Sequence, residues 1–265
     1  MSVKFGKEIY NTDHETVAAR GIEVDATLLT KMLHGPVKNI IYDKMGKKDV
    51  RELLNGVATT GFEKEKLQQI LTPQIEVTHT RIGEALCETF VANEHNCEFP
   101  WPASRDLKNP NASPAGADLV GFQHVADNDV PYRFAFGEVK TSTESKWPPT
   151  VSHREGGLQD QINDLRDSEK KKENIILYLY HHAKNATWMP MFQSAVKRYL
   201  RSISDVTIFG GLVRDVEPKE TDLSKHAVIS AKDKPTETNI TFVAIYLPIG
   251  IIPKLPKMLS GGLSA

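Results

Sequence analysis

The stretch "RFAFGEVKTST" (residues 133–143) begins with strand-forming residues and then carries an acid and a lysine two positions apart, Glu138 and Lys140. Side chains two apart on a strand point to the same face of the sheet. We therefore expect Glu138 and Lys140 to follow Phe134 and Phe136 onto one side. A face that starts with two aromatic rings and continues with a carboxylate and an ammonium passes from a core into a cleft.

The acid-x-lysine spacing is not specific by itself. Four further copies occur in the chain, at Asp106/Lys108, Glu144/Lys146, Glu169/Lys171 and Glu217/Lys219. These copies lie in a Pro/Asn-rich loop, in polar sequence after the strand, in a helical charge run and beside a proline, so we interpret them as solvated surface. Only the copy at Glu138 and Lys140 completes a predicted strand.

A second acid stands at the start of the preceding predicted strand, in "AGADLVGF" (residues 115–122). The polar turn at residues 127–129 predicts that the two strands form a hairpin, which would bring Asp118 beside Glu138 across the ladder. Buried carboxylates are costly unless they are paired or bind a cation, and two close together drive one of them to take up a proton. Mg²⁺ would relieve both costs, since it prefers carboxylate oxygens. The alternative is a salt-bridged strand pair that only ends a sheet.

A helix is predicted upstream in "HTRIGEALCETFVAN" (residues 79–93), with apolar residues on more than one side. Glu84 and Glu88 lie one turn apart on it and face the same way, so either could supply a third carboxylate. Lys140 could then orient an attacking water or stabilise charge that develops on a phosphate. The backbone carbonyl of Val139 is a further candidate ligand.

An Asp at the start of one strand, Glu-x-Lys on the next and a Glu on an earlier helix resemble the PD-(D/E)xK nuclease superfamily. The resemblance rests on "RIGEAL" (residues 81–86), "GADLVGF" (residues 116–122) and "FGEVKTS" (residues 136–142), with Ala117 where the family has proline. It implies a mixed sheet flanked by helices. It also implies four catalytic residues, Glu84, Asp118, Glu138 and Lys140, of which Asp118 and Glu138 would be the metal ligands.

The chain as a whole is more specifically similar to the HamA family, the nuclease subunits of the Hachiman anti-phage defence system. This resemblance implies a DNA-cutting effector that uses Mg²⁺, with Mn²⁺ as a substitute, and that is controlled by a partner helicase subunit, HamB. Two other functions stay open: a nuclease-like binding module that gates a helicase, and a nuclease that acts on RNA.

The chain divides by its patterns into a helical N-terminal section and an α/β core. Residues 1–77 are mostly helical by pattern, with segments at 24–33, 37–44, 50–57 and 63–71, and serve partner contact or support. The predicted core, residues 78–265, has strands at 117–125, 131–142, 174–182, 205–213 and 239–247 and helices at 79–93, 156–172 and 189–203, followed by a loose tail from residue 257. The whole chain is therefore expected to be an α/β protein with a mixed sheet.

The bulk composition is that of a soluble globular protein, with 40% hydrophobic and 25% charged residues. Two cysteines are too few for a disulfide framework, no apolar segment resembles a signal peptide, and no apolar run approaches the ~18 residues of a membrane span. These features predict a cytoplasmic protein.

The net charge of -1 gives no sign of a nucleic-acid partner, so any basic surface must be local. Six basic residues could line a path for phosphates: Lys170, Lys171, Lys172, Lys197, Arg198 and Arg201. A solvated charged face is the alternative for these six.

Overall fold

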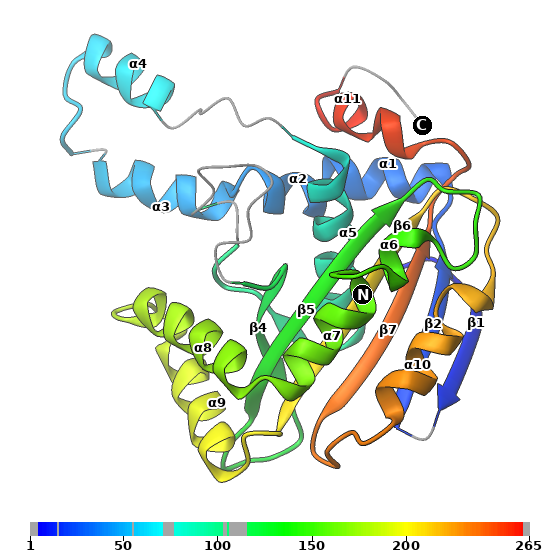
Figure 1. Cartoon of the computed structure of the whole chain (residues 1–265). Helices are drawn as coiled ribbons and strands as arrows, with labels where there is room; N and C mark the ends of the chain where they lie inside the picture. Colours follow the sequence, from blue (N-terminus) through cyan, green and yellow to red (C-terminus); the bar gives the residue numbers. More distant parts are fainter. Residues whose placement is uncertain are drawn as a thin grey trace.

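A mixed sheet runs through the part of the chain that the structure describes (Figure 1). The computed structural model describes residues 5–14, 16–54, 56–70, 77–102, 105 and 116–261. Within them the sheet has seven strands in the order β1-β2-β7-β6-β5-β4-β3. The strands are β1 (Lys7–His14), β2 (Val17–Glu23), β3 (Cys97–Glu98), β4 (Leu119–His124), β5 (Tyr132–Ser142), β6 (Val206–Arg214) and β7 (Asn239–Tyr246). The four strands from β2 to β5 in this order are parallel, and antiparallel pairs close both edges.

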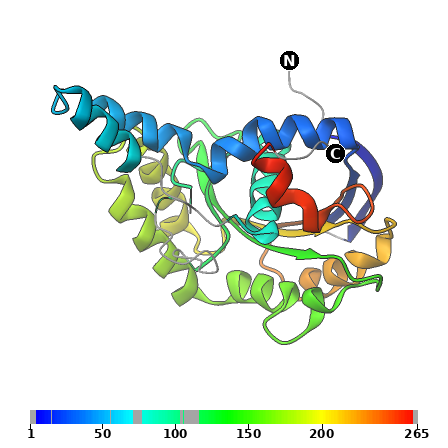
Figure 2. The same ribbon diagram turned by 90° about the horizontal axis from the view of Figure 1, so that it is seen from above.

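Helices cover both faces of this sheet, which confirms the predicted α/β class (Figures 1 and 2). One side carries α1 (Ala26–His34), α2 (Pro36–Ile41), α5 (His79–Glu94) and α11 (Leu255–Leu259). The other side carries α6 (Thr150–His153), α7 (Leu158–Asp167), α8 (Glu169–Ala183), α9 (Met189–Arg201) and α10 (Ser224–Ala231). Two more helices, α3 (Lys44–Leu54) and α4 (Gly61–Ile70), extend away from the sheet (Figure 2). Among the described helices, none has the length and apolar character needed to cross a lipid bilayer.

The pair β4–β5 confirms the predicted hairpin. Its register pairs Leu119 with Gly137. The turn is closed by Asp127, whose Oδ1 accepts hydrogen bonds from the N–H groups of Asp129 at 3.0 Å and Val130 at 3.1 Å. Aspartate favours turns because its side chain can bond the backbone in this way. This register places the residue before β4 opposite the residue that follows Gly137.

The two faces of β5 belong to different cores. Ala135 and Val139 are buried in the core under α1 and α5, whereas Phe134 and Phe136 are buried in the core under the helices from α7 to α10. This is the period-two alternation expected of a strand that is covered on both sides. Even-numbered positions of β5 therefore face the second group of helices.

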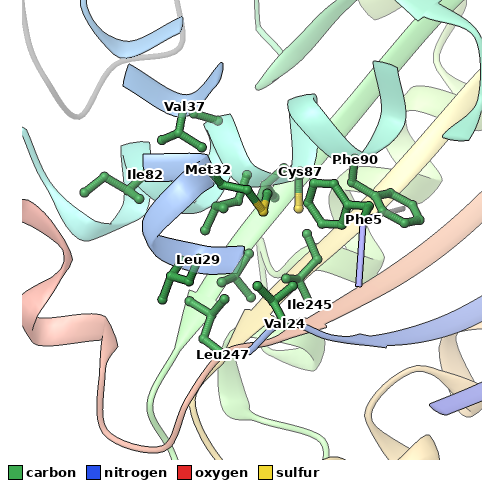
Figure 3. Close-up of a cluster of buried hydrophobic side chains, with 14 of the residues drawn as sticks. Phe5, Val24, Leu29, Met32, Val37, Ile82, Cys87, Phe90, Ile245 and Leu247 are labelled. Atoms are coloured by element: carbon green, nitrogen blue, oxygen red, sulfur yellow. The ribbon is translucent and has the colours of Figure 1, made fainter. Parts of the chain in front are cut away.

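The first core is filled mainly from α1, α5 and the sheet (Figure 3). Leu29 of α1 and Ile245 of β7 are each 0% exposed. Helix α5 is buried on more than one side, as predicted, because both Phe90 and its neighbour Val91 are buried. A helix apolar on several sides lies inside a protein rather than on its surface, so α5 has a fixed position against β5.

The helical character predicted for residues 1–77 holds only from α1 onward. The four predicted segments correspond to α1, α2, α3 and α4, and the end of the last one at residue 71 lies outside the described residues. The chain before them forms strands β1 and β2, which the sequence pattern did not reveal. Strand β1 is an edge strand with no fully buried residue, and β2 buries small residues such as Ala19. Such strands give a weak period-two signal.

The predicted strand at residues 174–182 is wrong, because this segment is part of helix α8. Its buried residues are Ile175, Leu179 and Ala183, four positions apart, while Leu177 between them is 53% exposed. The density of apolar residues hid this helical spacing, since short apolar runs do not separate strand from helix.

Two further helices were missed toward the C-terminus. Helix α10 joins β6 to β7, which the predicted order left without a connection, although parallel neighbours need a crossover. The tail predicted to be loose from residue 257 instead includes part of α11, whose Met258 and Leu259 are buried in the first core; residues 262–265 lie outside the described residues.

Helix α5 approaches β5 most closely at Gly83. A Cβ atom built at this position would overlap Thr141 Oγ1, so the helix can pack at this depth only with glycine. The hydroxyl of Thr141 is itself buried, and within the described part of the chain it has no hydrogen-bond partner. The contact therefore sets the distance between α5 and the end of β5.

We expect Gly83→Ala to lower the free energy of unfolding, because overpacking costs about 1–3 kcal/mol against the ~1 kcal/mol that alanine gains in a helix. Thr141→Ala removes the clashing hydroxyl, so the double variant should be at least as stable as Thr141→Ala alone. Urea denaturation of the four proteins measures this coupling. Gly61→Ala is the control, since a Cβ there meets nothing within 4 Å. Simple additivity of the two substitutions would contradict the contact.

Candidate active site

Asp118 and Glu138 lie side by side across the β4–β5 ladder, as predicted. The Asp118 N–H donates to the Gly137 carbonyl at 2.9 Å. The Val139 N–H donates to Asp118 Oδ2 at 2.8 Å, which holds that carboxylate against β5. Burial raises the pKa of Glu138, and the two carboxyl groups are close enough that the charge of Asp118 raises it further. Glu138 is only 4% exposed, and Asp118 beside it is half-buried.

Lys140 follows Glu138 on the same face of β5, as the strand alternation predicts. Its Nζ lies 4.0 Å from Glu138 Oε2, and its side chain is 22% exposed against 5% for that of Glu138. The aromatic residues Phe134 and Phe136 on this face are fully buried. Side-chain exposure on this face of β5 therefore increases from Phe134 to Lys140.

A second lysine reaches Glu138 from helix α8. Lys171 Nζ lies 3.6 Å from Glu138 Oε1. Sequence reasoning placed Lys171 in a charge run on a helix, either as solvated surface or as part of a phosphate path, and took the residues from 174 onward for a strand. With α8 identified as a helix, the signal is plain: Lys171 precedes the buried Ile175, Leu179 and Ala183 at four-residue spacing. Its side chain therefore lies on the sheet-facing side of the helix.

Glu84 lies on α5 near the same carboxylates. Its Oε2 accepts a hydrogen bond from Arg81 Nη1 at 2.5 Å, and its charge interacts with those of Asp118 and Lys140. The predicted helix places it there because Thr78 caps α5 by accepting from the Arg81 N–H. Glu84 is thus brought together with the other three predicted site residues.

Glu88, the alternative to Glu84, lies one turn further along α5. It borders a small pocket that is also lined by Asp118, Trp101 and Tyr178. Burial first, and then the charge of Glu84, raise the pKa of Glu88 to about 8. Both glutamates therefore lie on the side of α5 that faces the strand pair, and Glu84 is the one whose charge acts directly on Asp118 and Lys140.

The glutamates of this site hold protons more tightly than free carboxyl groups do. Burial, followed by the charge of Asp118, raises the pKa of Glu138 to about 8, although Lys171 and Lys140 act in the opposite direction. The same two causes, in the same order, raise the pKa of Glu84 to about 7, against the influence of Arg81 and Lys140. Near neutral pH the site therefore favours a proton, or another cation, over an uncompensated charge.

The donor set suits a hard divalent cation. Across the residues that the structure describes, no group of three or more His, Cys, Asp or Glu side chains is placed to hold a metal by itself. Mg²⁺, however, keeps several waters and is often bound through one or two carboxylates. Asp118 and Glu138 supply such a pair, and a cation between them would replace the proton that Glu138 favours. The residues present therefore fit Mg²⁺.

Most of the basic residues predicted to line a phosphate path are occupied elsewhere. Lys172 is 3% exposed, and its Nζ donates to the Arg166 carbonyl at 3.0 Å. The cations of α9 pair with acids: Lys197 and Arg201 with Asp129, and Arg198 with Asp127 and Asp205. Of the six, Lys171 is the one that contacts a predicted site residue.

Two of the other copies of acid-x-lysine make contacts outside the site, whereas Lys171 of the copy at 169–171 contacts Glu138. Glu144 Oε2 accepts from the Thr150 N–H at 2.8 Å. Glu217 is exposed, and Lys219 Nζ lies over the Trp147 ring at 3.7 Å from its centroid. Asp106 and Lys108 lie outside the described residues. The copy at 138–140 differs from those at 144–146 and 217–219, because its acid faces a second acid on the neighbouring strand.

Glu138→Gln should stabilise the protein in EDTA, and the gain should grow from about pH 5 to about pH 8. The carboxyl has a pKa of 4.5 as a free group and about 8 in the folded protein. Between these values the folded state keeps a proton that the unfolded chain releases, so stability falls as pH rises. Urea denaturation across this range tests the effect, with Glu144→Gln as control, because the Thr150 N–H lowers the pKa of that carboxyl. A gain that is independent of pH would contradict the assignment.

Comparison of the sequence with protein-family models and with curated proteins finds no match. The resemblance carried by "RIGEAL", "GADLVGF" and "FGEVKTS" therefore remains a prediction. The chain has a mixed α/β fold in which Glu84, Asp118, Glu138 and Lys140 converge at the β4–β5 pair, joined by Lys171.

Proposed function

We propose that this protein is a metal-dependent deoxyribonuclease with a PD-(D/E)xK fold, which hydrolyses phosphodiester bonds in DNA. The observation that carries the proposal is the pairing of the half-buried Asp118 with the buried Glu138, with Lys140 on the same strand face, 4.0 Å from Glu138. A structural salt bridge does not require two acids side by side. A bound cation accounts for two such acids, because it offsets the repulsion between them.

Each residue has a distinct role in the proposed reaction. Asp118 and Glu138 would hold Mg²⁺, for which Mn²⁺ can substitute, and the bound ion would supply Lewis-acid stabilisation of a phosphoryl oxygen. Lys140 orients the attacking water and stabilises the negative charge that develops on the phosphate. Glu84 helps to position that water. The water oxygen bonds to phosphorus as the bond from phosphorus to the leaving ester oxygen breaks, which leaves a phosphate monoester and a hydroxyl group.

The biological setting that we propose is anti-phage defence, with the nuclease controlled by a partner helicase of the HamB kind. The net charge of -1 supports this, because such a chain binds DNA weakly and benefits from delivery by another protein. The extended helices α3 and α4 also support a partner, since Val57 and Phe62 between and within them are 71% and 79% exposed. Apolar side chains that exposed are more typical of a surface that another protein covers.

Glu138→Ala/Lys140→Ala should abolish Mg²⁺-dependent cleavage while the protein stays folded, because the variant loses one metal ligand and the cation placed for the phosphate. The assay incubates the protein with plasmid, linear and single-stranded DNA and with RNA, in Mg²⁺ or EDTA, with and without its helicase partner. Glu217→Ala/Lys219→Ala is the matched control, since it removes the same two residue types from an exposed loop.

Full DNA degradation by the Glu138→Ala/Lys140→Ala variant at matched purity would overturn the proposal. Cleavage of RNA but not of DNA would show that the protein is a ribonuclease. Helicase binding without cleavage of any substrate by the wild type would favour a binding module.

A further inference from the structure

Two lysines from different elements contact the same carboxylate. Lys140 of β5 lies 4.0 Å from Glu138 Oε2, and Lys171 of α8 lies 3.6 Å from Glu138 Oε1. The two ammonium groups thus approach different oxygens of one buried acid. The nuclease motif accounts for Lys140 alone, so the position of Lys171 needs a separate explanation.

The fold holds Lys171 in place by its backbone and leaves its amine able to move. The Ser168 hydroxyl caps α8 by accepting from the Lys171 N–H at 3.2 Å. Ile175 and Leu179 anchor the same side of the helix at 1% and 0% exposure. The Lys171 side chain is nevertheless 23% exposed. Its amine can therefore turn from Glu138 to a ligand at the mouth of the site without a change in the helix.

Acidic and basic side chains meet in this site in equal number. The three acids are Glu84, Asp118 and Glu138, and the three basic residues are Arg81, Lys140 and Lys171. A divalent cation on Asp118 and Glu138 would add two positive charges beside the Lys171 amine. Like charges at such a separation repel strongly where water is partly excluded. The repulsion would drive the amine toward an anion.

We propose that Lys171 exchanges partners: it neutralises Glu138 while the cation is absent, and it binds a phosphodiester of the substrate once a divalent cation occupies Asp118 and Glu138. This proposal rests on the proposed nuclease function and adds a regulation to it, since substrate binding becomes dependent on the cation. Without the cation, Lys171 competes with it for Glu138; with the cation bound, Lys171 binds a phosphate of the substrate.

The neighbouring lysine provides a matched control. Lys170 stands next to Lys171 in the same helical turn and is exposed, so Lys170→Met removes the same charge without touching Glu138. Lys171→Met keeps the length of the side chain and its apolar stem but removes the ammonium. Lys171→Arg restores a cation that can bind phosphate.

Two binding measurements test the exchange. Mn²⁺ affinity is measured by calorimetry on the protein without DNA, where Lys171→Met should bind the ion about threefold to tenfold more tightly than wild type because a competing cation is gone. Binding of a fluorescent DNA oligonucleotide is measured in Ca²⁺ and in EDTA, with a gel to show that the oligonucleotide stays intact. In Ca²⁺, Lys171→Met should bind it more weakly, with a salt slope smaller by about 1. In EDTA the wild type and this variant should bind it equally.

Lys170→Met should match the wild type for Mn²⁺, and Lys171→Arg should recover the DNA binding in Ca²⁺. The exchange is overturned if Lys171→Met behaves like Lys170→Met in both measurements, or if it binds Mn²⁺ less tightly than wild type. A parallel cleavage assay of the wild type separates the two proposals. If the wild type cleaves DNA and Lys171→Met binds Mn²⁺ and DNA as the wild type does, the proposed exchange is wrong and the proposed nuclease function stands. If the wild type neither binds Mn²⁺ nor cleaves DNA, the exchange and the nuclease function are both wrong.

Discussion

The two hydrogen-bonded ladders on either side of β5 determine where Asp118, Glu138, Lys140 and Lys171 of the candidate site lie. The antiparallel ladder to β4 brings Asp118 to Glu138. The parallel ladder to β6 requires a connection that returns across the sheet, and this crossover carries α7, α8 and α9 over the face of Phe134 and Phe136. Helix α8 therefore arrives with Lys171 directed at the carboxylate pair. A slip of one residue in β5 would turn its acid and lysine into the opposite core.

The protein buries charge in two different ways. Arg214 and Asp222 are both 0% exposed and form a close pair, with 2.7 Å between Arg214 Nη1 and Asp222 Oδ1. Such a pair is self-contained and serves the fold. At Glu138 the lysines stand at 3.6 and 4.0 Å, beyond ordinary hydrogen-bond length, and a second acid lies alongside. Excess acid and loosely held cations are typical of sites that exchange ligands, where perturbed pKa values also gather.

The hairpin and its acid-lysine pair could be predicted because the information is local: a period-two pattern, a turn rich in Asp, and side chains fixed by strand alternation. Lys171 could not, since residues 174–182 contain enough apolar side chains to fit a strand as well as a helix. Only packing against the sheet decides between them, by burying Ile175 and leaving Leu177 outside. Strand β1 was not predicted because it has too few apolar residues, as is common for an edge strand. Local sequence patterns could not predict α8 and β1, because packing against segments distant in sequence decides their structure.

The parallel pairing of β2 with β7, which aligns Val17 with Ile240, joins segments from opposite ends of the described chain. During synthesis β2 leaves the ribosome long before β7 exists, so β6 has an unpaired edge and the β1–β2 hairpin has no place in the sheet. Contacts this remote in sequence also form slowly. The candidate site itself lies between Glu84 and Lys171, yet the sheet that supports it is complete only after β7 has been made. The candidate site is therefore supported by a complete sheet only when almost all of the described chain has been made.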